Sequence, residues 1–335
     1  MSIEKGDVKI LAGDIGGTKT VLGLFRSKGK ELAKIREEIF PSREYAGLDK
    51  IIRKFLPVRD PSIQSACFGV AGPVFENACK TTNLPWIVDA KDMSLEFGIA
   101  SVVLLNDLEA TAYGSLHLSE KEYCILNPGQ VRPQGNRCII AAGTGLGEAV
   151  LFWDGFKFRP SATEGGHTDF APRNSIEMNL LQYLMNRFPR VSNERVLSGP
   201  GILNIYQFLK DANPGEEPSW LSEQFGKEDP SALISRLALE KKSELCVKTL
   251  DLFVTLYGAE AGNLALKVMA TGGVYIGGGI GDKILTKLLD GAFMKAFNDK
   301  GRFASFMNRI PVRVILNEKT ALLGAAHYAG QLEEK

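Results

Sequence analysis

Residues Ile10–Phe25 read ILAGDIGGTKTVLGLF, and this stretch decides the fold. It looks like a phosphate-binding P-loop, but a P-loop has a glycine directly before its Lys-Thr pair, where this chain has Thr18. A P-loop also leads into a helix, whereas TVLGLF, which follows Lys19, is apolar and β-branched and therefore typical of a strand. The stretch predicts a hairpin of two strands joined by a glycine turn.

A second glycine turn heads the other half of the chain. Residues 137–155, RCIIAAGTGLGEAVLFWDG, again read as a strand, a glycine turn and a strand, without repeating the letters of the first hairpin. Strands alternate with helical patterns from residue 8 to about residue 114, and helical patterns follow the second turn. This alternation indicates layered α/β domains, and the repeated hairpin predicts two similar domains.

Several segments carry a more detailed prediction. Residues 30–40, KELAKIREEIF, fit either a further strand or a short helix. Residues 175–188 have helical spacing, with one apolar face made of Ile176, Leu180, Leu181, Leu184 and Phe188. The stretch from Ser231 to about Met269 reads as strongly helical, residues 312–317 as a strand and residues 320–330 as a helix of small residues.

The bulk composition is that of an ordinary globular protein. The 335 residues are 44% hydrophobic and 24% charged, and the length suggests about two domains. A net charge of +1 gives no general electrostatic reason to expect a nucleic acid or an anionic membrane as partner. Five scattered cysteines without a C-x-x-C pair argue against a disulfide framework and a Cys-rich zinc site. Since MSIEKGDVKI has no apolar signal core and no run is long enough to span a bilayer, we expect a cytoplasmic protein.

Three glycine turns, at residues 13–18, 143–147 and 272–281, are candidate phosphate-binding loops. Glycine lets backbone N–H groups approach a ligand closely, although a hairpin without a ligand would use the same residues. The two later turns do not fit the dinucleotide pattern G-x-G-x-x-G, because Glu148 and Asp282 stand at its final position. Three such turns favour a nucleotide phosphate clamp built from opposed hairpins over a Rossmann site.

Two aspartates stand where chemistry would be expected. Asp107 closes the buried strand of residues 101–107, and α/β proteins tend to place their chemistry at such strand ends; a helix N-cap is the alternative. Asp14, at the first hairpin tip, would repel phosphate unless Mg²⁺ intervened, so we predict that it orients a hydrated Mg²⁺. A local backbone bond is the alternative for Asp14. Lys19 is a weaker candidate for a phosphate contact.

Glu164 and His167 flank two glycines in TEGGHTDF. A lone histidine is usually a surface or core residue, yet this pair combines a donor and an acceptor suited to vicinal sugar hydroxyls. Residues 81–86, TTNLPW, either line a sugar site or pack locally.

The chain resembles the bacterial glucokinases of the actin-like ATPase superfamily from about Lys9 to the final helix. Seven segments stand in the order found in that family: GDIGGTK, GVAGPV, LLNDLEATAYG, AAGTGLGEA, EGGHTDFAPR, ERVLSGPGI and TGGVYIGGGI. The resemblance implies an α/β, two-domain actin-like ATPase (ribonuclease H-like) fold with an active-site cleft between the domains. It implies a small domain of residues 1–117 plus about 317–335 and a large domain of residues 118–316. It also implies ATP with Mg²⁺ as phosphoryl donor, D-glucose as acceptor and a homodimer.

The resemblance also assigns roles to residues. Asp107 becomes the general base that accepts the proton of the sugar 6-hydroxyl, and His167 becomes a sugar ligand because the Cys-rich zinc motif of ROK relatives is missing. The residues that the resemblance implies as ligands of the sugar hydroxyls are Asn106, Asp107, Glu164, His167 and Glu194. The residues that it implies for ATP binding are Gly13, Asp14, Ile15, Gly16, Gly17, Thr18, Gly143, Thr144, Gly145 and Gly278. It also implies that Asp14 binds Mg²⁺ through water.

Other functions stay open as alternatives. The nearest is a kinase of another hexose or of an amino-sugar in the same superfamily. An actin-like ATPase acting as a chaperone or filament subunit would leave Asp107, Glu164, His167 and Glu194 without a shared task. A sugar-responsive repressor would need a DNA-binding domain, which we do not expect ahead of a hairpin that begins so early in the chain.

Overall fold

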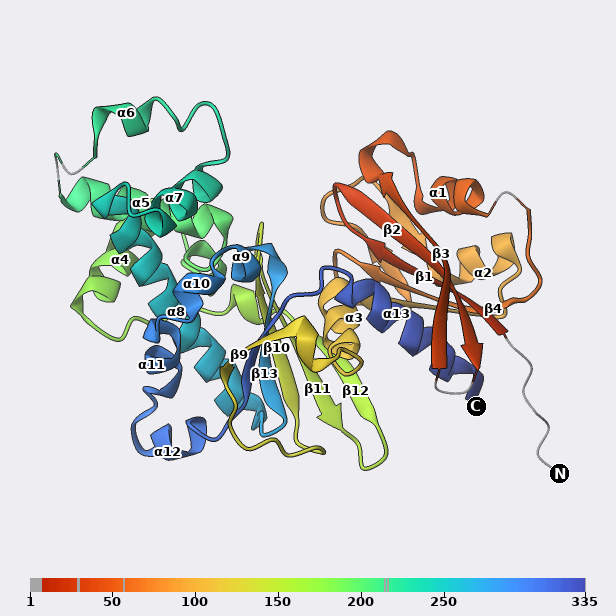
Figure 1. Cartoon of the computed structure of the whole chain (residues 1–335). Helices are drawn as coiled ribbons and strands as arrows, with labels where there is room; N and C mark the ends of the chain where they lie inside the picture. Colours follow the sequence, from red (N-terminus) through yellow and green to blue (C-terminus); the bar gives the residue numbers. More distant parts are fainter. Residues whose placement is uncertain (1–7, 29–30, 57, 214, 216, 335) are drawn as a thin grey trace. The chain divides into compact units, whose positions relative to one another are not determined.

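The computed structural model describes residues 8–28, 31–56, 58–213, 215 and 217–334 (Figure 1). They form two compact units: unit 1 comprises the chain up to Glu122, Phe156–Ala162 and the chain from Asn317, and unit 2 comprises Tyr123–Gly155 and Thr163–Leu316. The sequence prediction had placed residues 156–162 in the large domain. Residues 1–7, which include most of the stretch predicted to lack a signal core, lie outside the described residues.

Unit 1 is built on a five-stranded sheet in the order β3-β2-β1-β4-β8. β1 and β2 form the hairpin predicted from Ile10–Phe25, with Ile15 paired to Thr20 beside the turn. The segment that fitted either a strand or a helix is the antiparallel edge strand β3. Since β4 and β8 run parallel to β1, the carboxyl ends of these three strands meet at one edge. The strands are β1 Val8–Ile15, β2 Lys19–Lys28, β3 Glu31–Pro41, β4 Ile63–Val70 and β8 Ser101–Asn106, with a small separate sheet of β5 Val74–Phe75, β6 Ala78–Lys80 and β7 Ile87–Asp89.

The two faces of this sheet carry separate cores because neighbouring strand residues point to opposite sides. Leu11 and Ile15 belong to a core that includes residues of α1, whereas Ile10 and Ala12 belong to a core that includes residues of α13. α13 packs against both α3 and β1 (Figure 1). The helices are α1 Leu48–Phe55, α2 Ala90–Phe97, α3 Asp107–Gly114 and α13 Thr320–Gly330, and α13 has the predicted bounds.

Unit 2 repeats the plan of a hairpin followed by parallel strands. Its sheet contains strands in the order β11-β10-β13-β14-β9, in which β10 and β11 form the predicted second hairpin. β13 runs parallel to β10 and β14 runs parallel to β13, so the carboxyl ends of β10, β13 and β14 again share an edge. The strands are β9 Tyr123–Asn127, β10 Arg137–Ala142, β11 Leu146–Trp153, β13 Gly273–Gly277 and β14 Val312–Ile315. Strand β12, Phe158–Thr163, belongs to unit 1 except for Thr163.

The helices of unit 2 bury a single large core against this sheet. The helical stretch predicted from Ser231 to Met269 is two helices, α7 and α8, because Lys241 between them has φ 53°. On α4, Leu180 and Leu184 are buried as predicted, whereas Ile176 is 43% exposed. The helices are α4 Ser175–Met185, α5 Gly199–Ala212, α6 Ser219–Ser222, α7 Pro230–Leu239, α8 Glu244–Val268, α9 Gly278–Lys283, α10 Leu285–Leu288, α11 Ala292–Asn298 and α12 Ala304–Met307. Within the described part of the chain, every helix is too short or too polar to cross a lipid bilayer.

Candidate active site

The start of α3 places Asp107 at the carboxyl end of β8. Asn106 is the N-cap of this helix: its Oδ1 accepts a hydrogen bond from the Leu108 amide at 2.9 Å, and Glu109 Oε2 accepts one from the Asn106 amide at 2.9 Å. Asp107 is the first residue of the helix. The alternative that Asp107 serves only as the N-cap is therefore wrong, because Asn106 has that task. The Asn106 side chain also donates to the Gly72 carbonyl at 3.0 Å, so its position is held from both ends.

Asp14 and Asp107 share the same edge of the unit 1 sheet. Gly69 on β4 pairs with Asp14 on β1, and a Cβ at Gly69 would lie 3.7 Å from the Cα of Asp107. Burial, followed by the charge of Asp14, raises the pKa of Asp107 to about 6. Burial also raises the pKa of Asp14 to about 6, against the opposing effect of Lys19. Lys19 opposes this effect at Asp14, and hydrogen bonds from the Leu108 amide and the Asn106 side chain oppose it at Asp107.

At the tip of the first hairpin, some backbone amides are hydrogen-bonded within the turn and others are not. The Gly16 amide donates to the Lys19 carbonyl at 3.0 Å, so this N–H is not directed at a ligand. The amides of Gly17 and Thr18 make no hydrogen bond within the described residues, and Thr18 is exposed. A side chain on Gly17 would collide with Asn83, since its Cβ would lie 2.6 Å from the Asn83 Cβ. The Gly17 and Thr18 amides are therefore the donors that this turn can offer.

Two residues predicted to bind ATP are core residues of unit 1. Gly13 is buried in β1, where a Cβ would lie 2.7 Å from Phe68 and 2.9 Å from Leu22. Ile15 is 1% exposed, and its carbonyl accepts a hydrogen bond from the Ala71 amide at 3.1 Å. Their contribution is to hold Asp14, which stands between them, in place.

The glycine turn of unit 2 leaves Thr144 exposed between two glycines. The Gly143 amide donates to the Gly145 carbonyl at 2.8 Å, and the Gly143 carbonyl accepts from the Gly199 amide at 2.8 Å. Gly278, at the start of α9, is exposed with φ 79° and lies so close to the Ala142 carbonyl that a side chain would overlap it. The second and third predicted glycine turns therefore lie side by side at one sheet edge.

The residues predicted to bind sugar in unit 2 come from two short turns. Glu164 directly precedes the turn η3 (Gly165–His167), and His167 ends it. Glu164 Oε2 lies 3.9 Å from His167 Nε2, and both side chains are more than half exposed. Glu194 lies in the turn η4 (Asn193–Arg195). The buried Asn193 joins these turns, because its amide donates to the Thr168 carbonyl at 2.9 Å and its Nδ2 donates to Thr168 Oγ1 at 3.1 Å. The fold thus brings all three predicted unit 2 ligands together.

Glu194 also contacts the glycine turn of unit 2. Its Oε2 accepts a hydrogen bond from the Leu146 amide at 3.0 Å, and a side chain on Gly145 would overlap the same oxygen. The predicted phosphate turn and the predicted sugar ligand are therefore one connected structure.

Residues 81–86 pack locally, which was the alternative for this segment. Trp86 is 2% exposed and its Nε1 donates to the Tyr45 carbonyl at 3.1 Å. Thr81 Oγ1 donates to the Leu84 carbonyl at 2.9 Å. Asn83 is the member of the segment that reaches the first hairpin turn, through its contact with Gly17.

Glu109 is a supporting residue that the sequence prediction missed. Its Oε1 accepts a hydrogen bond from the Ala162 amide at 3.0 Å while its Oε2 closes the cap of α3. The signal was present, because an Asn or Asp three residues before a Glu at the start of a helix is a capping pattern. The bond to Ala162 had no signal in the sequence.

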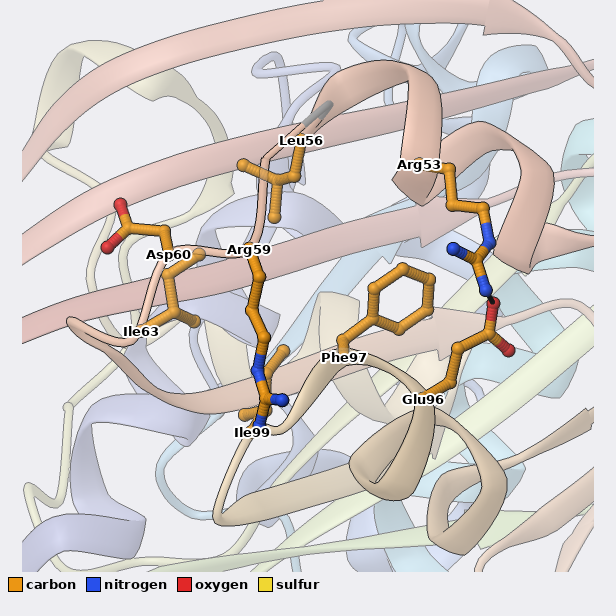
Figure 2. Close-up of a pocket in the computed structure, with 8 residues that line it drawn as sticks. All are labelled: Arg53, Leu56, Arg59, Asp60, Ile63, Glu96, Phe97 and Ile99. Atoms are coloured by element: carbon orange, nitrogen blue, oxygen red, sulfur yellow. Dashed lines mark ion pairs between the residues drawn. The ribbon is translucent and has the colours of Figure 1, made fainter.

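A separate pocket of unit 1, about 260 Å³ in volume, lies near the amino-terminal ends of β4 and β8, away from Asp107 (Figure 2). Its acids are already paired: Glu96 lies 2.5 Å from Arg53, and Asp60 lies 2.7 Å from Lys9. Figure 2 shows the Phe97 ring between Arg53 and Arg59. The pocket contains none of the residues predicted to act on sugar or ATP.

The donors present at these turns fit Mg²⁺ bound together with a nucleotide. Among the described residues, no group of three or more His, Cys, Asp or Glu side chains is placed to hold a metal by itself. Mg²⁺ is typically held by one or two carboxylates, with water and substrate phosphates completing its shell. In unit 1, Asp14 is a carboxylate of this kind, and the Gly17 and Thr18 amides beside it have no hydrogen-bond acceptor within the described residues.

Known proteins share the sequence and the fold of this chain. A family model described as Glucokinase matches residues 11–332. A glucokinase of Nostoc punctiforme is 43% identical over 338 residues, which cover 96% of this chain and 99% of that protein. The crystal structure of a glucokinase from an Antarctic psychrotroph superposes with a TM-score of 0.85 at 30% identity, covering 98% of this chain and 100% of that one.

A more distant structure is similar in fold alone. The ROK family glucokinase from Streptomyces griseus, in complex with glucose and AMPPNP, superposes with a TM-score of 0.63 at 19% identity and covers 97% of this chain and 100% of that one. The predicted actin-like ATPase fold is confirmed. With a family model, a relative and a structure that match nearly from end to end, the chain belongs to the glucokinase family.

Proposed function

We propose that this protein is an ATP-dependent glucokinase that phosphorylates the 6-hydroxyl of D-glucose. The observation that carries the proposal is the placement of Asp107, a carboxyl group with a pKa of about 6 at the carboxyl end of β8 and beside a second carboxyl group. Such a group is ionised at neutral pH yet basic enough to accept a proton, which is the requirement for a general base.

Each of the other residues has a task in this reaction. Glu164, His167 and Glu194 hold sugar hydroxyls, since the fold gathers these three exposed or half-exposed polar side chains on two joined turns. Asn106 holds the start of α3 and thereby the direction of Asp107. Phosphoryl transfer has a loose transition state, so Asp107 contributes by positioning the attacking hydroxyl as well as by taking its proton.

The proposed phosphoryl donor is ATP with Mg²⁺. Asp14 would hold the metal, the Gly17 and Thr18 amides and the Gly143–Gly145 turn would bind phosphate oxygens, and the exposed Gly278 would lie against the nucleoside. Bound Mg²⁺ neutralises charge that develops on the phosphates. Streptomyces griseus glucokinase has been crystallised with glucose and AMPPNP, which supports this choice of donor.

The experiment is a phosphorylation assay with a panel of sugars. Purified protein with ATP and Mg²⁺ should convert glucose to glucose 6-phosphate, detected by coupling to glucose-6-phosphate dehydrogenase. The same assay, read as ADP release, should give a lower kcat/KM with mannose, fructose, N-acetylglucosamine and N-acetylmannosamine. A preference for an N-acetylated sugar would favour the alternative of an amino-sugar kinase. ADP release without sugar dependence would overturn the assignment.

We extend the proposal to the setting of the protein. A homodimer, suggested by the resemblance to bacterial glucokinases, is tested by light scattering after size-exclusion chromatography. The near-neutral charge supports a cytoplasmic protein that binds neither nucleic acid nor membrane.

A further inference from the structure

Glu148 is a buried carboxyl group that the proposed mechanism does not use. It is the one charged residue in the otherwise apolar run of residues 146–152, and it is only 2% exposed. Its Oε1 has no hydrogen-bond partner in the described part of the chain. Because buried polar atoms are nearly always hydrogen-bonded, an unpartnered buried carboxylate oxygen indicates a candidate functional residue.

The carboxyl group of Glu148 packs directly against the turn that carries the predicted sugar ligands. A side chain on Gly165, the first residue of η3, would overlap Glu148 Oε2. The backbone of Glu148 supports the same turn: Thr163 Oγ1 donates to the Glu148 carbonyl at 3.0 Å and accepts from the Gly165 amide at 3.1 Å. Glu164 and His167 are therefore held on β11 at the position of Glu148.

The neighbouring strand position supports the rest of the sugar site. The Leu146 amide donates to Glu194, and a side chain on Gly166 would overlap the Leu146 carbonyl. The first three residues of β11 thus form one platform under both sugar-binding turns. Because the turns pack directly on this platform, a change in its shape or charge would move the predicted sugar ligands directly.

The surroundings of Glu148 make its charge costly. Cys138 on β10 and Tyr257 on α8 face it, and burial raises the pKa of both groups, so they are neutral at physiological pH. Glu260 and Lys267 on α8 are the charged groups that act on it from that helix, and the turn itself carries Glu164 and His167. Burial and then the charge of Glu260 raise the pKa of Glu148 to about 7, while Lys267 opposes this.

We infer that Glu148 is a positioning residue whose protonated form lets Gly165 pack on β11, and that its ionisation displaces the turn and weakens glucose binding. The inference rests on the proposed function of Glu164 and His167. Ionisation of Glu148 leaves its buried Oε1 charged and without a donor, and this is relieved when water enters beside Gly165 or when turn amides move toward the carboxylate. Either change moves Glu164 and His167 relative to Glu194. Glucose affinity should therefore fall as pH rises through about 7.

The test is the glucose Kd, measured by isothermal titration calorimetry without nucleotide, between about pH 6 and about pH 9. The wild-type Kd should rise about tenfold over this range, a typical coupling between two sites. Glu148→Gln, which keeps the shape of the neutral carboxyl, should hold the low Kd at every pH. Equal pH profiles for wild type and Glu148→Gln would overturn the inference.

A second variant keeps the test decisive if Glu148→Gln folds poorly. Lys267→Met removes the cation that favours ionised Glu148, so the rise in Kd should move to higher pH. Lys248→Met removes a lysine from the same helix and should leave the profile unchanged. If Lys267→Met has the wild-type profile, the inference fails.

Failure of the proposed function has a different signature. Glu164→Gln and Glu194→Gln should each raise the glucose Kd at every pH if these residues bind sugar. If neither does, the sugar site is wrong. If both do and the profile of Glu148→Gln matches the wild type, only the role of Glu148 is wrong.

Discussion

Asp14 and Asp107 lie on either side of Gly69, and the charge of Asp14 contributes to the raised pKa of Asp107. Because Gly69 has no side chain, the first turn of α3 can pack closely on β4: a Cβ at Gly69 would lie 2.9 Å from the Ala110 Cβ and 3.7 Å from the Asp107 Cα. This arrangement places two carboxyl groups, each with a pKa raised to about 6, at one sheet edge of unit 1. The first predictions follow from it.

Replacing the base should reduce turnover without abolishing sugar binding. Asp107→Asn keeps the size of the side chain and removes its basicity, so kcat should fall by about 10²–10⁴. The glucose Kd should stay within a few-fold of the wild type, because the ligands of unit 2 are intact. Steady-state kinetics and calorimetry measure the two quantities, with Asp92→Asn on the exposed face of α2 as a charge-matched control. Normal turnover would contradict the role of Asp107.

Filling the space at Gly69 should misplace α3. A Cβ there would lie 2.9 Å from the Cβ of Ala110, so Gly69→Ala should destabilise the protein by about 1–3 kcal/mol and lower kcat. Ala110→Gly removes the opposing atom. The double variant Gly69→Ala/Ala110→Gly should therefore recover much of the lost kcat, even though glycine in a helix costs about 1 kcal/mol. A double variant as slow as Gly69→Ala would show that packing at this point does not control Asp107.

The carboxyl group of Asp14 should lower the stability of the folded protein at neutral pH while allowing it to bind Mg²⁺. Since burial raises its pKa to about 6, the native state binds more protons than the unfolded state between about pH 4 and about pH 6, and stability falls as pH rises through that window. At pH 7 Asp14→Asn should therefore melt at a higher temperature than the wild type when both lack nucleotide. Differential scanning fluorimetry should also show that Mg²⁺ adds to the stabilisation by AMPPNP in the wild type and not in Asp14→Asn. Equal effects of Mg²⁺ would refute the metal role.

Displacing Glu194 should weaken sugar binding specifically. Because a side chain on Gly145 would overlap Glu194 Oε2, Gly145→Ala should raise the glucose KM about tenfold or more. Gly226→Ala is the matched control, since a Cβ at that glycine has nothing within 4 Å. Kinetics at varied glucose with saturating ATP measure the effect, and an unchanged KM would mean that the contact between turn and carboxylate has no role in binding.

The stacked rings of His117 and His327 should make unit 1 sensitive to acid. Their centroids are 3.5 Å apart with planes 3° apart, and burial followed by the neighbouring His327 lowers the pKa of His117 to about 4. The unfolded state therefore binds more protons than the native state between about pH 6.5 and about pH 4, and stability is lost as pH falls through this window. His117→Phe keeps a ring in the stack without the proton.

Urea unfolding followed by circular dichroism tests this prediction. His117→Phe should exceed the wild type in stability near pH 5 by more than it does near pH 7.5. The exposed His167 provides a control, because His167→Gln should leave the difference between the two pH values unchanged. A wild-type pH dependence in His117→Phe would exclude the stack as its source.

Much of this architecture follows from short-range patterns. Both hairpins were predictable because apolar alternation and glycine turns are local signals, and the bounds of α13 follow from its run of small apolar residues. The break between α7 and α8 was missed because Lys241 adopts a positive φ, and a lysine gives no signal in the sequence for that conformation. The choice between Asn106 and Asp107 as helix cap was also hidden, since both residue types serve in that position.

Features that depend on distant contacts could not be predicted from one sequence. The bond from the Ala162 amide to Glu109 joins residues far apart in the chain and leaves no periodic trace. The burial of Glu148 had a signal, a single acid in an apolar strand, but its contact with Gly165 depends on how β11 and the following turn meet. The roles of Asp107, Glu164, His167 and Glu194 came from resemblance and remain predictions until the variants above are measured.

The order of segments in unit 1 has a consequence for biosynthesis. α13 covers Ile10 and Ala12 and packs on α3, yet it leaves the ribosome only after the whole of unit 2 has been translated. Until then the nascent chain has an uncovered apolar sheet face, and α3 lacks the helix that packs on it. A chain that ends before residue 320 would therefore expose this apolar face permanently, and we expect it to be inactive and prone to aggregation.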